Sequence, residues 1–402
     1  MRLFLFTENF PFGKSETFLE NEIPFLSEKF SEIVIIPLYK QEELRQMPDN
    51  VTVWQSWLNF NPKNKKKLLT SGIFNMSPFG FAVKEFFRKK VYLNKNRLWN
   101  FFTSILLFRS IYANKKLKSK LYHAIEKEDK LYFYWGDKAA LLIPSLKKKI
   151  NNPVFVRFHR MDIYEEMRNN YIPFRKYLFP AIDWFVPIAE DGRKYLISHY
   201  TDIQLDKIKL SRLGVFDNGL NAERKNEVFH LLSCSNIVPV KRVNLIVEAL
   251  QNVDFEIQWT HIGAGRLFDK IKSETENLPS NVHVNFLGML SNKEVMNFYR
   301  QHHVDLFLNV SESEGVPVSI MEALSFGVPV MATDVGGTAE IVDNQVGNLL
   351  KKDVSADDLA NEIAFFTKNN LSELRKNART RWNERCDAEK NYREFVAFLN
   401  EF

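Results

Sequence analysis

Short apolar runs alternate with longer amphipathic segments along almost the whole chain. In the first half these runs predict strands over residues 2–7, 32–38, 131–134, 154–158 and 184–188. In the second half they predict strands over residues 230–233, 255–262, 282–287, 304–310 and 328–333. The segments between them include predicted helices over 15–29 and 243–250. Buried strands that alternate with helices are typical of parallel sheets covered on both faces. The pattern therefore predicts an α/β protein with two doubly wound, Rossmann-like domains.

The stretch from Gly214 to Asn221 is rich in turn-forming residues and separates the two series of strands. We predict an amino-terminal domain over residues 1–216 and a carboxyl-terminal domain over 217–386, with a cleft between them. An amphipathic closing helix is predicted over 387–402. A length of 402 residues fits two domains better than one core.

The composition indicates in which cellular compartment the protein is expected. Apolar residues make up 45% of the chain and charged residues 26%, as in ordinary soluble proteins. The two cysteines, Cys234 and Cys386, lie far apart and predict a reducing compartment rather than a disulfide framework. The apolar run at the amino terminus is too short for a signal peptide, and residues 98–108 are too few to span a bilayer. We expect a cytoplasmic protein, soluble or peripheral to a membrane.

The charge is distributed unevenly. Residues 61–122 hold 15 Lys and Arg and one acid, Glu85, for a net charge of +14, whereas the rest of the chain carries −8. Aromatic residues are interleaved with this basic block, namely Phe79, Phe81, Phe86, Phe87, Trp99, Phe101 and Phe102. Three interpretations compete: a solvated helical face, a nucleic-acid patch, or a face that rests on anionic lipid. No recognised nucleic-acid motif accompanies the block, and the aromatic residues favour the anionic membrane surface, on the inner face of the cell membrane.

The most informative segment follows the predicted strand 304–310. Glu314 and Gly315 come after that strand, Pro317 stands where the first helical position is expected, and the helix runs through Glu322. Ligands in such sheets bind beyond the carboxyl ends of the strands. This loop is therefore a candidate ligand site.

A second loop of the same kind follows the strand 328–333. Its residues Gly336 and Gly337 allow a ligand to approach the backbone, and another helix is predicted near Glu340. Helix amino termini favour anions, so the two loops together predict a diphosphate site. Glu314 and Glu322 could then accept hydrogen bonds from sugar hydroxyls. The alternative is two solvated glutamates that flank a packed helix.

Residues 314–322, Glu-Gly-Val-Pro-Val-Ser-Ile-Met-Glu, resemble the E-x7-E motif of the retaining family 4 glycosyltransferases, which have the GT-B fold. The following residues continue that resemblance through Glu340. Shorter stretches are similar to other motifs of members that assemble bacterial exopolysaccharide, capsule or lipopolysaccharide. These stretches are residues 10–18, 158–164 and 235–242.

The resemblance implies roles for the matching residues. Glu314 would contact the transferred sugar, Glu322 the ribose, and Lys241 the diphosphate. His159 would hydrogen-bond the donor sugar near the reacting carbon. The other implied donor-binding residues are Arg242, Leu290, Gly315, Val316, Val318 and Ser319, and the implied acceptor-side residues are Gly13, Ser15, Glu16, Thr17 and Asp162.

The resemblance also implies the reaction. A hexose would pass from a nucleotide-diphosphate sugar to a glycan acceptor with retention of configuration, without a metal or a cofactor, and a donor phosphate oxygen would serve as base. The sequence has no Asp-x-Asp and no histidine spacing for a metal. The basic aromatic block suggests that the acceptor is linked to a lipid.

Two residues depart from the family pattern. Asn236 stands where the family often has arginine, and Pro317 stands where it often has glycine, which removes one backbone donor. These departures keep open a peripheral membrane scaffold with a non-catalytic nucleotide-sugar site. A nicotinamide enzyme is a weaker alternative, because Gly263-Ala-Gly265 lacks the third glycine of a dinucleotide fingerprint. A phosphorylase would need a pyridoxal lysine or a phosphate-specific pocket, and the sequence indicates neither.

Overall fold

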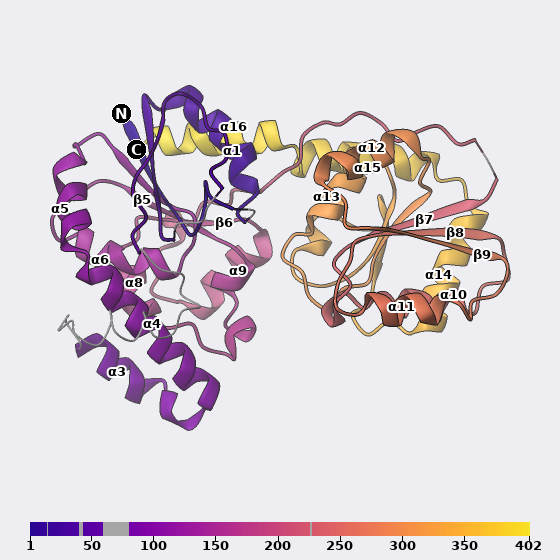
Figure 1. Ribbon diagram of the computed structural model, residues 1–402, viewed down its shortest axis with the longest axis horizontal. Coiled ribbons are helices and arrows are strands. Elements are labelled where there is room, and N and C mark those ends of the chain that lie inside the picture. Colours follow the sequence, from indigo (N-terminus) through magenta and orange to yellow (C-terminus); the bar gives the residue numbers. More distant parts are fainter. Residues whose placement is uncertain (14, 40–42, 59–79, 226) are drawn as a thin grey trace. The chain divides into compact units, whose positions relative to one another are not determined.

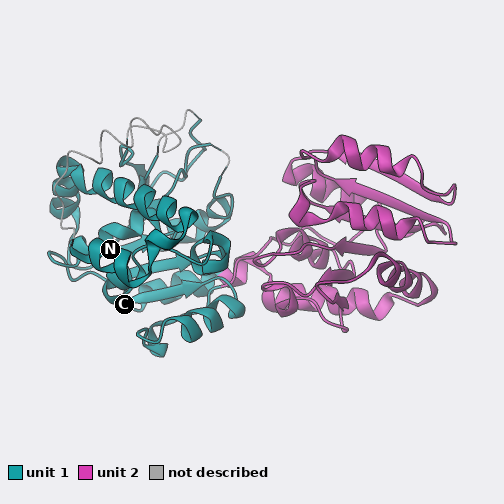
Figure 2. Ribbon diagram, turned by 90° about the horizontal axis from the view of Figure 1, so that it is seen from below, with its two compact units in different colours: residues 1–211, 392–402 teal, residues 212–391 magenta. Residues whose placement is uncertain are grey.

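The computed structural model describes residues 1–13, 15–39, 43–58, 80–225 and 227–402 (Figure 1). Residues 61–79 of the basic block, including Phe79, and Lys14 in the predicted acceptor-side loop lie outside the described residues. The chain forms two compact units (Figure 2). The amino-terminal unit comprises residues 1–211 and 392–402, and the carboxyl-terminal unit comprises residues 212–391. The boundary between the two units along the chain lies between residues 211 and 212. The sequence predicts it between residues 216 and 217.

The amino-terminal unit is built on a parallel sheet that has six strands among the described residues, in the order β3-β2-β1-β4-β5-β6. The strands are β1 (Arg2–Thr7), β2 (Glu32–Pro37), β3 (Val51–Val53), β4 (Lys130–Phe133), β5 (Val154–Phe158) and β6 (Trp184–Pro187). Almost every residue of β1, β2, β4 and β5 is buried, as expected for a parallel sheet covered on both faces. The three-residue edge strand β3 is not predicted by the sequence pattern.

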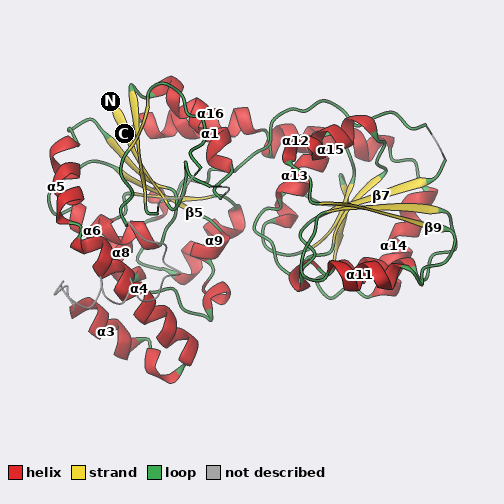
Figure 3. Cartoon of the chain, viewed as in Figure 1, coloured by secondary structure: helices red, strands yellow, loops and turns green. Residues whose placement is uncertain are grey.

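Helices cover both faces of this sheet (Figure 3). They are α1 (Phe18–Lys29), α3 (Gly80–Arg88), α4 (Lys95–Ala113), α5 (Lys115–Ala124), α6 (Ile143–Leu146), α7 (Arg160–Ile163), α8 (Arg175–Leu178) and α9 (Glu190–His199). Short 3₁₀ helices are η1 (Val91–Leu93), η2 (Lys138–Leu142), η3 (Glu165–Arg168), η4 (Phe179–Ala181) and η5 (Leu205–Lys207). Helix α1 begins at Phe18, three residues later than predicted, because the preceding residues form the loop described below.

The carboxyl-terminal unit repeats the architecture with a parallel sheet in the order β12-β11-β10-β7-β8-β9. The strands are β7 (Phe229–Cys234), β8 (Ile257–Ile262), β9 (Val282–Gly288), β10 (Leu306–Asn309), β11 (Val330–Thr333) and β12 (Gly347–Leu350). The helices are α10 (Val243–Leu250), α11 (Phe268–Thr275), α12 (Asn292–Gln301), α13 (Val318–Ser325), α14 (Ala356–Lys368) and α15 (Ser372–Arg385), with the 3₁₀ helices η6 (Pro239–Lys241) and η7 (Thr338–Glu340). Helices α12, α13 and α15 cover one face, and α10, α11 and α14 cover the other (Figure 1).

Counted along the chain, both sheets have the strand order 3-2-1-4-5-6 of the Rossmann fold. The order reverses between β1 and β4 in the amino-terminal unit and between β7 and β10 in the carboxyl-terminal unit. The loops that follow these four strands open at the switch points, where ligands bind in such sheets. The predicted α/β class with two Rossmann-like domains is confirmed.

Helix α16 (Ala388–Asn400) starts in the carboxyl-terminal unit and continues into the amino-terminal unit from Tyr392 onward. Its Phe395 ring lies 4.3 Å from the guanidinium carbon of Arg157, which belongs to β5. Arg157 also forms a 3.3 Å ion pair with Glu22 of α1, and both side chains are fully buried. Burial raises the pKa of Glu22, and the charge of Arg157 opposes that rise.

Candidate functional site

At the switch point of the carboxyl-terminal unit, the loops after β7 and β10 meet. Lys241, at the end of η6, places its Nζ 2.5 Å from Oε1 of Glu314 in the loop after β10. Asn309 Nδ2 lies 3.3 Å from the same oxygen. The backbone N–H of Glu312 donates to the carbonyl of Val240 at 2.9 Å, which joins the two loops directly. The structure therefore brings together Lys241 and Glu314, which are 73 positions apart in sequence.

The glycine-rich loop after β11 packs against the Glu314 loop. Gly336 has φ +56°, and a Cβ there would lie 2.1 Å from the carbonyl oxygen of Glu314. The N–H of Gly337 donates to the carbonyl of Gly315 at 2.7 Å. The loop thus holds the backbone of Glu314 and Gly315 in place by a close approach that only glycine permits.

The helix predicted near Glu340 is only the three-residue 3₁₀ helix η7. After Ile341 the chain reaches β12 at Gly347 without forming another helix. The carboxylate of Glu340 instead pairs with Arg212 at 3.2 Å.

Helix α13 begins at Val318, directly after Pro317 rather than at it. Among the described residues, no side chain caps this helix. The N–H groups at its start, at Val318 and Ser319, lie about one turn before Glu322 and shortly after Gly315 and Val316 in the sequence. An uncapped helix amino terminus is suited to bind an anion, because its first N–H groups have no partner within the helix.

Glu322 lies within α13 and is buried, with 7% of its surface exposed. Its Oε1 accepts a hydrogen bond from Asn292 Nδ2 at 2.6 Å. Burial raises the pKa of Glu322 to about 7, and the bond from Asn292 limits the rise. Leu290 and Val318 are partly buried and pack against the hydrophobic core to which α12, α13 and α15 contribute. Glu322 can therefore change protonation state near neutral pH.

Arg242 follows Lys241 and adopts a left-handed backbone conformation, with φ 48°. Its Nε donates to the carbonyl of Val310 at 2.7 Å, and its buried Nη2 has no hydrogen-bond partner among the described residues. Asn236, where the family often has arginine, is exposed. Arg242 is thus a second cation beside the switch point.

Gly263 and Gly265 have a structural explanation. A Cβ at Gly263 would lie 1.9 Å from the carbonyl oxygen of Ser235, and a Cβ at Gly265 would lie 2.4 Å from that of Ile237. The two glycines therefore allow the loop that leads to Lys241 to pass close to the end of β8. These close approaches account for both glycines without a dinucleotide fingerprint.

In the amino-terminal unit, His159 follows β5 and is buried. Its Nε2 lies 3.1 Å from the carbonyl oxygen of Tyr134, so Nε2 carries a proton, because a carbonyl oxygen only accepts hydrogen bonds. Burial lowers the pKa of His159 to about 3, with a contribution from the nearby Arg157 charge. The ring centroid lies 4.4 Å from that of Trp135. His159 is thus a neutral imidazole that packs, tilted by 42°, against Trp135 in the loop after β4.

Asp162 is turned inward. Its carboxylate accepts the N–H of His159 at 2.6 Å and that of Gly136 at 2.5 Å, and only 1% of the residue is exposed. Burial raises the pKa of Asp162. Arg175 donates to the carbonyls of Gly136 and Asp162. Asp162 therefore positions the loops after β4 and β5 rather than presenting a group to an acceptor.

Glu16 orders the loop after β1 in the same way. Its carboxylate accepts the N–H groups of Glu8, Asn9 and Phe10 at 2.7–2.9 Å and the indole N–H of Trp135 at 2.7 Å.

Next to Glu16, Arg45 donates to the carbonyls of Gly13 at 2.8 Å and Ser15 at 2.6 Å. Ser15 and Thr17 are exposed, so they are the predicted acceptor-side residues that remain accessible.

Sequence reasoning missed Trp135, Asn292 and Asn309. Trp135 and Asn309 stand at the carboxyl ends of strands that flank a switch point, and this position is the signal that could have identified them. Asn292 opens helix α12 and has no such signal. In the part of the chain that the structure describes, no group of three or more His, Cys, Asp or Glu side chains is placed to hold a metal ion.

Two parallel sheets of this strand order, with the paired loops at their switch points, define the class of two-domain α/β proteins with the GT-B fold. Solved structures agree. A lipopolysaccharide outer core galactosyltransferase, WaaB, matches the whole chain with a TM-score of 0.70 at 16% identity. Anabaena Alr3699/HepE in complex with UDP matches it with a TM-score of 0.66 at 14% identity, and each alignment covers 100% of both chains.

Sequence comparison then gives the family of the carboxyl-terminal part. Residues 220–385 match the family described as glycosyl transferases group 1. A glycosyltransferase of uncharacterised role from Methanocaldococcus jannaschii, MJ1178, is 30% identical over 239 residues, which are 58% of this chain and 62% of that protein. The O-antigen biosynthesis glycosyltransferase WbnH of Escherichia coli is 36% identical over 105 residues, 25% of this chain and 27% of that protein. This chain carries a group 1 glycosyltransferase domain, which confirms the resemblance, and it matches less than two thirds of the length of either relative.

Proposed function

We propose that this protein transfers a sugar from a nucleotide-diphosphate sugar to a glycan acceptor in the biosynthesis of a cell-surface polysaccharide. The observation that carries the proposal is the Lys241–Glu314 ion pair beside the uncapped start of α13. A cation and a helix amino terminus stabilise the charge that a departing diphosphate develops. The O-antigen relative and the UDP complex of HepE support a glycan product and a nucleotide-sugar donor.

The proposed reaction proceeds with retention and uses no metal and no cofactor. The bond between the anomeric carbon and the diphosphate oxygen breaks, and the acceptor hydroxyl oxygen bonds to that carbon on the same face. The hydroxyl proton passes to a phosphate oxygen of the leaving diphosphate. Lys241 and the first N–H groups of α13 stabilise the leaving group, Glu314 binds hydroxyls of the transferred sugar, and Glu322 binds the ribose.

Donor binding should depend on pH through Glu322. The ionised carboxylate is the better acceptor for ribose hydroxyls, and burial places its pKa at about 7. The affinity for the donor is therefore highest above that pKa, where the carboxyl is ionised. It falls below that pKa, where the carboxyl is protonated. We expect UDP-glucose to bind about tenfold more weakly at about pH 6 than at about pH 8 by isothermal titration. The phosphates of UDP-glucose keep a constant charge over this range.

Two variants make this test specific. Glu322→Gln should bind UDP-glucose with the same affinity at both pH values. The matched control is Glu362→Gln, because Glu362 also accepts a hydrogen bond from an asparagine amide, that of Asn348 at 2.7 Å. It should keep the wild-type dependence. A wild-type affinity that does not change with pH would remove the ribose role of Glu322.

We further propose that the enzyme works on a lipid-linked acceptor at the inner, anionic face of the cell membrane. Over residues 80–122, the basic block holds eleven Lys and Arg, and its one acid, Glu85, is bonded to the Tyr171 hydroxyl and the Phe174 N–H. Large apolar side chains of α3, η1 and α4 are exposed beside these cations, namely Val83, Phe87, Tyr92, Leu93, Trp99 and Phe102. Cations beside exposed aromatic residues are typical of an interfacial helix. None of the helices among the described residues has the length and apolarity that crossing a membrane requires.

Vesicle co-sedimentation tests the membrane proposal. Leu93→Asp places a charge on the exposed apolar face, where 69% of Leu93 is accessible. Pelleting with phosphatidylglycerol-containing vesicles should fall about tenfold. The control is Leu220→Asp in the other unit, where Leu220 is 67% exposed and pelleting should not change. Equal pelleting with neutral and anionic vesicles, insensitive to salt, would contradict the proposal.

A second candidate function is a membrane scaffold with a nucleotide-sugar site that does not catalyse transfer. The exposed Asn236, which supplies no cation to the diphosphate site, is the observation that favours it. Both candidates bind a nucleotide diphosphate. Only the enzyme turns the donor over, so titration combined with a transfer assay on membrane extract separates them.

A further inference from the structure

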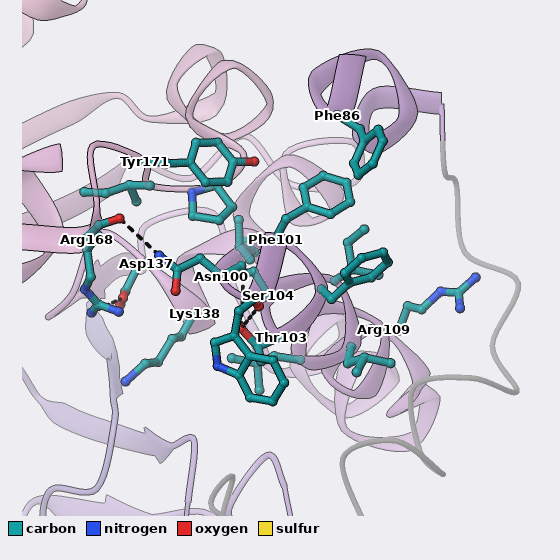
Figure 4. Close-up of a pocket in the computed structure, with 18 of the residues that line it drawn as sticks. Phe86, Asn100, Phe101, Thr103, Ser104, Arg109, Asp137, Lys138, Arg168 and Tyr171 are labelled. Carbon is teal, nitrogen blue, oxygen red and sulfur yellow. Dashed lines mark hydrogen bonds and ion pairs between the residues drawn. The ribbon is translucent and has the colours of Figure 1, made fainter. Parts of the chain in front are cut away.

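A pocket of about 930 Å³ lies within the amino-terminal unit, bordered by α3, α4 and the residues around 136–141 and 168–173 (Figure 4). This volume falls in the range of roughly 300–1,000 Å³ that is typical of small-ligand sites. All of its described lining residues belong to the amino-terminal unit, and neither the proposed donor-binding residues nor the predicted acceptor-side residues are among them.

The interior of the pocket is apolar and aromatic. Phe86, Phe101 and Leu107 contribute to its lining, and Phe101 and Leu107 are themselves buried in the core of the unit. Trp99 and Phe102 also line the pocket, yet 55% and 48% of their surfaces are exposed. The apolar surface is therefore continuous from the exposed face of α4 into the pocket, as an entering hydrocarbon chain requires.

One side of the pocket is charged. Asp137, Lys138 and Arg168 lie together there, and Arg109 lies on the opposite side with Phe101 between (Figure 4). Arg168 Nη2 is 3.5 Å from Asp137 Oδ2. Among the described residues that line the pocket, three cations stand against the single acid Asp137. Lys138 pairs with Glu8 and Arg168 pairs with Asp137, so a phosphate group would bind here by taking the place of a carboxylate as the partner of these two cations.

The charged side lies near the switch point of the amino-terminal sheet. Asp137 and Lys138 follow β4, and Lys138 forms an ion pair with Glu8, which follows β1. The N–H of Glu8 is in turn bonded to Glu16 at 2.9 Å. A phosphate beside Lys138 would thus sit next to the loop that carries the exposed residues Ser15 and Thr17.

We propose that this pocket binds a single-chain lipid phosphate, with the hydrocarbon chain among the aromatic residues of α3 and α4 and the phosphate beside Lys138 and Arg168. The pocket takes one chain from the membrane surface, in contrast to the exposed face of α3 and α4, which rests on many headgroups at once. That the bound chain is the lipid of the acceptor rests on the proposed function. The binding itself does not.

Isothermal titration with dodecyl phosphate, below its critical micelle concentration, tests the proposal on the full chain. Ser104→Trp fills the pocket from α4, because Ser104 is one of its lining residues. The matched control is Ser119→Trp on α5, where Ser119 is exposed and outside the pocket. We expect saturable binding to the wild type, at least about tenfold weaker binding to Ser104→Trp and unchanged binding to Ser119→Trp.

Further arms separate the chain from the phosphate. Arg168→Gln should weaken dodecyl phosphate about three- to tenfold but leave dodecyl maltoside unchanged, since the maltoside has the same chain without the charge. Inorganic phosphate alone should not bind measurably. Trp99→Ala removes a half-exposed lining ring, so it tests the pocket again if Ser104→Trp fails to fold, and it should weaken both amphiphiles.

Three outcomes would overturn the proposal: no saturable binding of dodecyl phosphate to the wild type, equal loss in Ser104→Trp and Ser119→Trp, or unchanged affinity in both Ser104→Trp and Trp99→Ala. Because no sugar transfer is measured, the result is independent of the donor site. Binding without any turnover would instead count against the proposed function alone.

Discussion

Replacing Lys241 by alanine is expected to lower kcat for sugar transfer by about 10²–10³-fold, with a similar loss in kcat/KM. The ammonium group lies 2.5 Å from Glu314 at the switch point, with 23% of its side chain exposed, so it can reach both the loop and a bound diphosphate. Its removal takes away the cation that stabilises the departing diphosphate and leaves the Glu314 carboxylate unpaired. Glu314→Ala should abolish turnover as well, through loss of contacts to the transferred sugar. Single-turnover transfer from a labelled nucleotide sugar measures both variants.

The control for this experiment is Lys376→Ala, because Lys376 is exposed on α15 and has no part in the proposed site. It should transfer sugar at the wild-type rate. Transfer at the wild-type rate in either Lys241→Ala or Glu314→Ala would remove this pair from the catalytic site.

Glu22→Ala is expected to destabilise the protein by about 3–5 kcal/mol, because it leaves the guanidinium of Arg157 buried without its counter-charge. Both side chains of the pair are fully buried, and their 3.3 Å contact joins α1 to β5. For a unit of this size, each kcal/mol lowers the melting temperature by roughly 2–4 °C. Differential scanning calorimetry of the full chain should therefore show one transition shifted strongly downward.

A second ion pair, formed by Glu28 of the same helix α1, provides the comparison. Glu28 and Arg393 are 3.1 Å apart, but their side chains are 54% and 51% exposed. Glu28→Ala should cost about 0–1 kcal/mol, since exposed ion pairs contribute little. Equal shifts for Glu22→Ala and Glu28→Ala would show that burial of the Arg157 pair carries no special weight.

The sequence pattern predicts most of the sheet and misses its edges. Strand β5 is predicted with its observed bounds because four of its five residues are apolar, and helix α10 is predicted equally well. The pattern misses β3 and β12, because a strand of three or four partly exposed residues gives no periodicity. Their pairing is decided by the neighbouring strands β2 and β11, which are distant in sequence.

The sequence likewise predicts some residues of the candidate site and misses others. A motif within one loop and helix indicates Glu314 and Glu322, but their partners Asn309 and Asn292 depend on how the loops pack. Residue type alone could not separate Asp162, which is turned inward onto backbone N–H groups, from the exposed Thr17. Burial and hydrogen bonding, which only the fold determines, distinguish residues that hold a loop from residues that can meet a ligand.

The division of helix α16 between the units has a consequence for biosynthesis. Residues 212–391 form one continuous unit, so this unit has its whole sequence while residues 392–402 are still to be translated. The amino-terminal unit lacks Phe395 and Phe398 until then, and these buried rings pack on Arg157 and on Phe155 of its sheet. Domains fold as units during synthesis, generally in order from the amino terminus. In this protein the first unit to leave the ribosome is the second to be completed, and the part of its sheet that α16 covers stays exposed in the interval.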